Sequence, residues 1–256
     1  MAIYLKSEKD IELMRKAGQI VGQTLQLLSE HVKPGVTTRE LDEMAYKFIT
    51  SKGAIPTFKG YHPFRDIAPF PGSICASVNE EIVHGIPSDR VLKEGDVIAL
   101  DCGAIYRGFH GDSAVTVPVG KVSPEIEKLL ETGKASLHAG IEKARPGVRL
   151  GDLSHSIEVR IMQGGDYGIV REYGGHGIGR SLWEEPSVPN FGAAGKGLPL
   201  RAGMVIAIEP MLNMGTYETE TLDDGWTVVT KDRKPSVHFE HTVAITENGP
   251  QILTLP

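Results

Sequence analysis

Two separate segments of the sequence recur about 110 residues further along the chain. Lys33–Val36 (KPGV) resembles Arg145–Val148 (RPGV) at a shift of 112 residues, and Gly95–Asp101 (GDVIALD) resembles Gly203–Glu209 (GMVIAIE) at a shift of 108. A repeat constrains the whole fold, because each copy must form a similar unit and bury its apolar face against a neighbour. The alternative is chance, since Pro-Gly turns and Val-Ile strands are both common.

If the repeat is real, each half is an α+β unit that ends in a sheet. We therefore predict one domain spanning residues 1–256, with internal halves at about 1–120 and 121–256. Hydrophobic periodicity and cap residues predict helices that follow Ser7, Thr38 and Ser123 and that end at about Lys33, Gly53 and Ala144. Clusters of β-branched residues between turn signals predict strands at 74–78, 97–105, 109–117, 204–211, 226–231 and 237–246.

The composition excludes several classes of protein. A net charge of −6 argues against a nucleic-acid-binding surface, which needs Lys and Arg to neutralise phosphates. Cys75 and Cys102 are the only cysteines, too few for a disulfide framework and without zinc-ribbon spacing. The first ten residues lack a signal-peptide core, and apolar runs such as Val97–Leu100 are too short to span a membrane. We expect a cytoplasmic protein that does not bind membranes.

Four acidic residues lie in or at the ends of apolar strand patterns. Asp101 and Asp112 flank Tyr106–Gly108, so a hairpin turning there would set the two carboxylates opposite each other, about 5 Å apart at Cβ. Glu209 ends the repeated strand, and Glu240 lies inside the last strand pattern. Buried acids at such distances repel unless divalent cations let them stay ionised. The pattern favours a metal site.

Other interpretations of these residues remain open. Asp101 or Asp112 alone is typical of a turn or a helix cap, and Glu240 could be a solvated strand residue. His176 lies in the glycine-rich stretch Tyr173–Gly179, as either a metal ligand or a hydrogen-bonded loop histidine. That stretch lacks the full spacing of a phosphate loop. Strand alternation turns His241 away from Glu240, and we interpret His241, His238 and His110 as structural.

Seven motifs along nearly the whole chain support a family resemblance. They are Ser73–Glu80 (SICASVNE), Val83–Pro87 (VHGIP), Asp101 through Gly111-Asp112, Gly175–Gly179 (GHGIG), Ile208–Met211 (IEPM), Asp224–Thr227 (DGWT) and Phe239–Thr242 (FEHT). With these motifs the chain resembles the type I methionine aminopeptidases, which have the pita-bread fold of creatinase and aminopeptidase P. The resemblance implies an α+β fold of two pseudo-symmetric halves around a curved antiparallel sheet.

The resemblance also implies a dinuclear metallo-exopeptidase. By it, Asp101 binds one metal, Asp112 and Glu240 bridge both, and His176 and Glu209 bind the other. Such oxygen-rich ligands suit Co, Mn, Fe(II) or Zn, and a monovalent cation is a further possibility in this family. Glu209 would also move the proton, and His84 would hydrogen-bond the substrate near the scissile amide.

The implied substrate is the initiator methionine of nascent, ribosome-associated polypeptides whose second residue is small. Its side chain would lie against Tyr61, Phe70, Cys75 and Trp226, apolar walls that suit an unbranched thioether. We expect the enzyme to be a monomer.

Two features depart from the family pattern. Trp183 stands where most members have a second histidine that contacts the substrate, and an indole can donate one hydrogen bond but cannot accept one. We therefore expect lower turnover or an altered substrate pose; the alternative is that Trp183 only closes the pocket rim. Residues 63–69 replace a single glycine of the family, and this loop could reshape the site, with Arg65 and Asp66 facing either substrate or solvent.

These departures keep three hypotheses open. The first is removal of the initiator methionine. The second is a related metallo-exopeptidase acting on Xaa-Pro or another N-terminal residue, and the third is a non-enzymatic peptide-binding protein with the same fold. The third is weakened because all five metal-ligand positions are intact.

Overall fold

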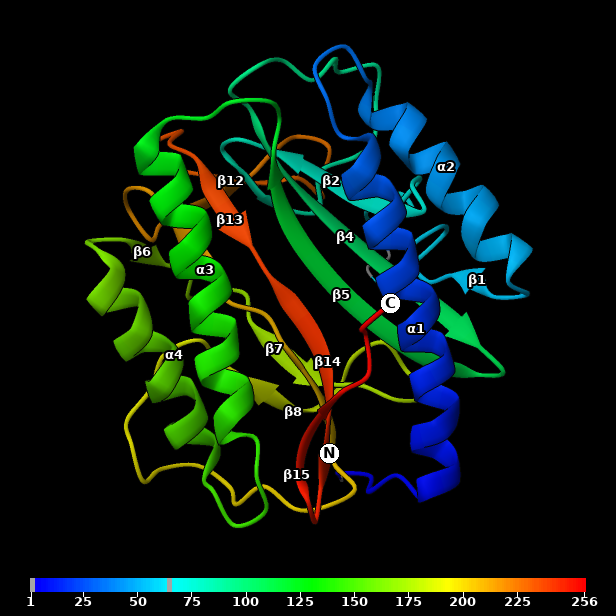
Figure 1. Cartoon of the computed structure of the whole chain (residues 1–256), viewed down its shortest axis with the longest axis vertical. Coiled ribbons are helices and arrows are strands. Elements are labelled where there is room, and N and C mark those ends of the chain that lie inside the picture. The colour runs from blue at the N-terminus through cyan, green and yellow to red at the C-terminus, as the bar shows by residue number, and fades with distance from the viewer. Residues whose placement is uncertain (1–2, 64–65) are drawn as a thin grey trace.

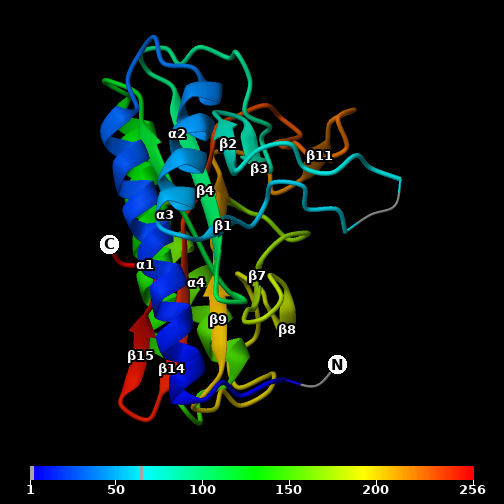
Figure 2. The ribbon, with the colours of Figure 1, turned by 90° about the vertical axis from the view of Figure 1, so that its right-hand side faces the viewer.

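A layer of four helices covers one face of a curved antiparallel sheet, and short hairpins lie on the opposite face (Figures 1 and 2). The computed structural model describes residues 3–63 and 66–256. The helices are α1 (Glu8–His31), α2 (Thr38–Ser51), α3 (Pro124–Lys143) and α4 (Leu150–Gly164). The predicted α+β class, with two halves around one sheet, is confirmed.

Side-chain caps explain where the predicted helices begin. Ser7 accepts a hydrogen bond from the Asp10 N–H and its own N–H donates to the Asp10 carboxylate, which forms a capping box at the start of α1. Thr37 caps α2 in the same way, so this helix begins one residue earlier than predicted. Helix α4 was not predicted, because no Ser, Thr, Asp or Asn marks its start: Arg149 occupies the N-cap position without a side-chain cap bond.

The strands are β1 (Ile55–Pro56), β2 (Ile74–Val78), β3 (Glu81–Val83), β4 (Val97–Tyr106), β5 (Phe109–Pro118), β6 (Gly168–Ile169), β7 (Gly175–Gly177), β8 (Glu184–Val188), β9 (Val205–Ile208), β10 (Met211–Asn213), β11 (Thr219–Thr221), β12 (Val228–Thr230), β13 (Ser236–His238), β14 (Glu240–Thr246) and β15 (Gly249–Ile252). In the part of the chain described, the main sheet runs β1-β4-β5-β14-β9-β7-β8, with β2 added to β4 and β15 added to β14.

Two strands that were predicted as continuous are broken at the same level of the sheet. The predicted strand 204–211 divides into β9 and β10 around Pro210, and 237–246 divides into β13 and β14 at Phe239. Proline has no N–H to donate, and the Phe239 N–H donates across the break to the Pro210 carbonyl. The outer parts therefore form a separate small sheet, β13-β10-β6.

Each half buries its own helix pair against its own strands. One apolar cluster joins α1 and α2 to β2 and β4, for example through Leu41 and Leu100, and another joins α3 and α4 to β9 and β14, for example through Ile157 and Ile208. This arrangement agrees with the sequence repeat. The boundary near residue 120 stays a prediction.

Glycine lets α1 lie directly on the strand that carries the site. A Cβ atom on Gly111 of β5 would lie 2.7 Å from the backbone nitrogen of Gly18 in α1, closer than real Cβ atoms approach. The helix therefore fixes the position of β5 one residue before Asp112.

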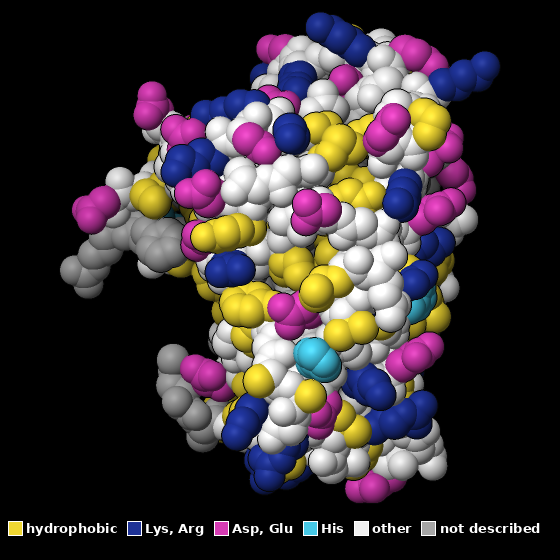
Figure 3. All heavy atoms as spheres, turned by 90° about the vertical axis from the view of Figure 1, so that its left-hand side faces the viewer, with side chains coloured by type: hydrophobic (Ala, Val, Ile, Leu, Met, Phe, Trp, Pro, Cys, Tyr) yellow, Lys and Arg dark blue, Asp and Glu magenta, His cyan; other side chains and the backbone are white. Residues whose placement is uncertain are grey.

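Charges of both signs are mixed over the side of the molecule that carries α4 (Figure 3). Neither sign dominates that face. No helix in residues 3–63 and 66–256 has the length and apolar character needed to cross a membrane.

Candidate active site

A cavity of about 490 Å³ is lined from the face of the sheet opposite the long helices. Alternating residues of β4 point to opposite faces of the sheet. Leu100 and Cys102 point into the helix-covered core, and Asp101 points into the cavity. All eleven predicted site residues line the cavity.

The register of the sheet sets three of the predicted acids on one face. Asp101 in β4 pairs with Ala114 in β5, and Ala114 pairs with Glu240 in β14. Asp112 lies two residues from Ala114, on the same face, and pairs with Gly103. The hairpin was therefore predicted correctly, but the expectation that the two aspartates lie directly opposite each other is wrong. The small partners Ala114 and Gly103 leave space between the carboxylates.

The remaining two predicted ligands lie in β7 and directly after β9. His176 in β7 pairs with Ala207 in β9. Glu209 directly follows β9 and, two residues after Ala207, lies on the same face as Ala207. Glu209 thus ends an apolar strand as predicted. Asp101, its counterpart in the repeat, instead lies in the middle of β4, which continues to Tyr106.

Three of these residues are close enough to share an ion. One ligand atom each from Asp112, His176 and Glu240 lies within 4.8 Å of the others. One oxygen each of Asp101, Asp112 and Glu240 is buried without a hydrogen-bond partner among the described residues. Such orphaned carboxylate oxygens are costly in a protein interior unless a cation compensates them.

The pKa values of the buried carboxyl groups also indicate a cation site. Burial, and then the neighbouring carboxylates, raise the pKa of Asp112 and of Glu240 well above their usual values. Burial raises the pKa of Asp101 to about 7, although His238 opposes the shift. The metal-free protein therefore favours protons on these groups, and a divalent cation would replace those protons.

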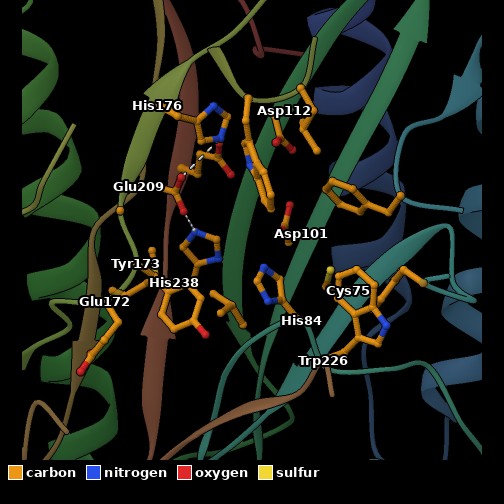
Figure 4. A pocket seen from close by; sticks show the side chains of 18 of the residues that line it. Cys75, His84, Asp101, Asp112, Glu172, Tyr173, His176, Glu209, Trp226 and His238 are labelled. Atoms are coloured by element: carbon orange, nitrogen blue, oxygen red, sulfur yellow. Dashed lines mark ion pairs between the residues drawn. The ribbon is translucent and has the colours of Figure 1, made fainter. Parts of the chain in front are cut away.

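His176 is oriented for ligation by its own backbone. Its Nδ1 lies 2.8 Å from the carbonyl oxygen of Gly177, so Nδ1 carries the proton that it donates there. Nε2 keeps its lone pair and lies 3.5 Å from Oε1 of Glu209 (Figure 4). The glycines beside His176 are required by packing, because a Cβ on Gly175 would collide with the Ala207 carbonyl of β9.

Glu209 also faces a histidine that was interpreted as structural. His238 lines the cavity, is 2% exposed, and holds its Nε2 3.4 Å from Oε2 of Glu209. His238 therefore lies in the cavity lining, and its interpretation as structural, not as a metal ligand, stays a prediction. The signal that could have found it is alternation, since residues 238 and 240 share a face in an extended chain.

The other two histidines lie outside the cavity lining. His241 points to the opposite face from Glu240, where its Nδ1 lies 2.8 Å from Oγ1 of Thr254. His110 contacts Thr57 through Nδ1 at 3.3 Å.

Aromatic and sulfur side chains line one end of the cavity. The predicted pocket residues Tyr61, Phe70, Cys75 and Trp226 are all there, joined by Phe58, Ile67 and Leu182, which were not predicted. The rings of Phe70 and Trp226 meet edge to face with centroids 5.3 Å apart. Burial, and then the charge of Asp101, raise the pKa of the Cys75 thiol well above its usual value, so Cys75 is a neutral wall residue.

The 63–69 loop contributes directly to this apolar end. The Trp226 indole N–H donates to the Ala68 carbonyl oxygen at 2.8 Å, and Ile67 lies against Gly225 and lines the cavity. Asp66 is exposed and does not line the cavity. Arg65, which was expected to face substrate or solvent, lies outside the described residues.

His84 lies between the apolar end and a more polar end that includes Glu172 and Tyr173 (Figure 4). Its φ of 61° is unusual for a non-glycine residue, and its ring lies edge-on to Tyr173 and Trp226 at 5.7 and 6.3 Å. Burial lowers its pKa to about 4, although Glu209 opposes the shift. His84 is therefore neutral at physiological pH.

Trp183 stands at the rim of the cavity with 45% of its surface exposed. Its ring lies edge-on to Tyr61 at 5.4 Å and to His176 at 6.3 Å between centroids. This position agrees with the rim interpretation and also sets the indole beside a predicted metal ligand. The adjacent Glu184 forms an ion pair with Lys6 at 2.6 Å, with both side chains largely buried.

Comparison with known proteins agrees with this geometry. Residues 12–247 match metallopeptidase family M24. A methionine aminopeptidase from Clostridium perfringens is 53% identical over 253 residues, which cover 99% of each chain. The structure of methionine aminopeptidase from Rickettsia prowazekii superposes with a TM-score of 0.95 at 41% identity, over 99% of this chain and 100% of that one. A prolidase from Pyrococcus furiosus gives 0.78 at 25% identity, over 98% of this chain and 65% of that one. The chain belongs to metallopeptidase family M24 and, within it, to the methionine aminopeptidases.

Proposed function

We propose that the chain removes the N-terminal methionine from nascent polypeptides through a dinuclear metal centre. The observation that carries this proposal is the buried cluster of Asp112, His176 and Glu240 beside an apolar pocket. The unpartnered carboxylate oxygens provide the hard donors that Mn, Fe(II), Co or Zn bind. The residues present therefore fit a pair of divalent ions.

The family resemblance implies the ligand roles, and the positions of the side chains support them. Asp101 would help to hold one ion and His176 and Glu209 the other, while Asp112 and Glu240, between them in the sheet, would contribute to both. The register supports this assignment, because β5 and β14 lie between β4 on one side and β9 and β7 on the other. When bound, the two ions would activate a water molecule and polarise the scissile carbonyl.

Glu209 is the proposed proton carrier. Burial raises its pKa, but the imidazoles of His238 and His176, one beside each carboxylate oxygen, outweigh burial and hold the pKa below its usual value. An ionised carboxylate can accept the proton of the attacking water and pass it to the leaving amine.

The substrate would be held by groups of two kinds. The methionine side chain would occupy the apolar end among Tyr61, Phe70, Cys75 and Trp226, where an unbranched thioether makes favourable contacts with aromatic edges. His84, neutral and between the two ends of the cavity, would hydrogen-bond the peptide near the scissile amide. The rest of the bound peptide would extend through the polar end of the cavity, past Tyr173.

A peptide panel tests this function. The protein, loaded with Mn²⁺ or Co²⁺, is assayed for amino-acid release from Met-Ala-Ser and from Xaa-Pro peptides, with Glu209→Ala as the blank. Metal-dependent release of methionine supports the proposal. Preferential cleavage of Xaa-Pro would select the related exopeptidase instead, and absence of metal-dependent release from every peptide would favour a peptide-binding protein.

Trp183 gives a specific reason to test the substrate pose. If the indole replaces a hydrogen-bonding histidine, Trp183→His should raise the rate on Met-Ala-Ser. An unchanged or lower rate would indicate that Trp183 only closes the rim with Tyr61. The cytoplasmic location, the monomeric state and a monovalent cation remain predictions.

A further inference from the structure

His238 is a buried polar side chain with unmet hydrogen-bonding capacity. It is 2% exposed, and neither ring nitrogen has a partner that meets hydrogen-bond geometry among the described residues. Buried groups of this kind are rare and call for an explanation. An imidazole in a protein interior loses its hydrogen bonds to water, and without protein partners nothing compensates that cost in free energy. The ring faces the cavity, between Glu209 and His84 (Figure 4).

The backbone fixes where this ring can lie. The His238 N–H donates to Oγ1 of Thr116, and the Thr116 hydroxyl donates to the His238 carbonyl, both at 2.8 Å. His238 also pairs with Met211 in the small sheet. With its main chain held on both sides, the imidazole has little freedom to leave the cavity.

The Glu209 carboxylate stands between two imidazoles. Oε1 lies 3.5 Å from Nε2 of His176, and Oε2 lies 3.4 Å from Nε2 of His238. The first contact joins two proposed ligands of the same ion. The second turns the other oxygen toward a side chain that could donate to it from Nε2.

We propose that His238 is a positioning residue: its Nε2–H holds Oε2 of Glu209, so that Oε1 is presented to the metal beside His176. Partners of this kind fix the orientation of ligating carboxylates in metal sites. The inference rests on the proposed metal centre. In the proposed metal centre His238 orients Glu209 and does not itself bind an ion.

Three substitutions separate this role from simple packing. His238→Gln keeps an amide N–H near the position of Nε2. His238→Asn is also polar but is too short to reach Glu209, and His238→Phe keeps the ring volume without a donor. His241→Gln is the matched control, because His241 lies on the opposite face of the neighbouring strand.

The readouts are the Mn²⁺ affinity of the chelator-stripped full chain, measured by calorimetry, and the steady-state kinetics on Met-Ala-Ser. We expect His238→Asn and His238→Phe to weaken Mn²⁺ binding by about 10–100-fold and to lower kcat more than they raise KM. His238→Gln and His241→Gln should stay close to the wild-type affinity.

Two results would overturn the role of His238. One is unchanged Mn²⁺ affinity in His238→Asn and in His238→Phe, and the other is a loss in His238→Gln as large as in His238→Asn. Because His238→Asn and His238→Gln are both polar, the comparison holds even if His238→Phe does not fold. A wild-type chain that binds no Mn²⁺ would instead refute the proposed function itself.

Discussion

Replacing Asp101 with asparagine removes one charge from a cluster of buried carboxylates without changing its shape. In the metal-free protein, burial raises the pKa of Asp101 from 3.8 to about 7. The folded chain therefore holds a proton on this group over a pH range in which the unfolded chain has lost it. The stability that this proton provides is fully present below about pH 4 and is lost as the pH rises through 7.

The size of the effect follows from the shift in pKa. A difference of roughly three units, at about 1.4 kcal/mol per unit, removes about 4 kcal/mol from the free energy of unfolding of the metal-free wild type at pH 8. About 3 kcal/mol of this loss falls between pH 5 and pH 8. Asn cannot ionise, so Asp101→Asn should escape the loss, and its advantage over the wild type should grow with pH.

The assay is urea denaturation with a chelator present at pH 5 and pH 8, with Asp166→Asn on the surface as the control. Added Mn²⁺ should then reverse the order, because the wild type gains binding energy that Asp101→Asn largely loses. The reasoning fails if the two proteins lose stability in parallel between the two pH values, or if Asp101→Asn is the less stable of the two at pH 8 in chelator.

Two further substitutions and one pH titration probe other parts of the structure. Lys6→Met leaves Glu184 buried without its ion pair and should lower the free energy of unfolding by roughly 3 kcal/mol in urea titration, with Lys6→Arg closer to wild type; equal stability of all three would contradict a structural ion pair. Gly111→Ala should cost about 1–3 kcal/mol, because its methyl group meets the backbone of Gly18; a stabilised variant would show that α1 can move away. The ring of His84, whose pKa burial lowers to about 4, should keep the NMR shifts of neutral imidazole from pH 5 to 8, and a titration within that range would contradict its burial.

Apolar strand patterns singled out Asp101, Asp112, Glu209 and Glu240, whereas His176, in a glycine-rich stretch, was assigned from the family motif; all five line the cavity. The relative positions of Asp101 and Asp112 could not be predicted to the residue. Arg107 and Gly108, both with positive φ, form a two-residue turn between the paired Tyr106 and Phe109. Moving the centre of a hairpin by one residue moves every partner by two, so a small error in the turn separated two acids expected to face each other.

Other features depend on contacts between segments far apart in the chain, which a pattern of neighbouring residues cannot predict. The break of β13 and β14 at Phe239 follows from pairing with the Pro210 region, which lies about thirty residues earlier. Alternation within the predicted strand already placed His238 on the face of Glu240, although His238 was interpreted as structural. The start of α4 was missed since Arg149 carries no cap signal.

The most direct test of the metal centre is an anomalous difference map from crystals of the wild-type protein soaked in Mn²⁺. The account predicts two peaks about 3.5–4 Å apart, with Asp112 and Glu240 touching both, Asp101 one, and His176 and Glu209 the other. Density absent from this cavity, or peaks bound by other residues, would contradict it.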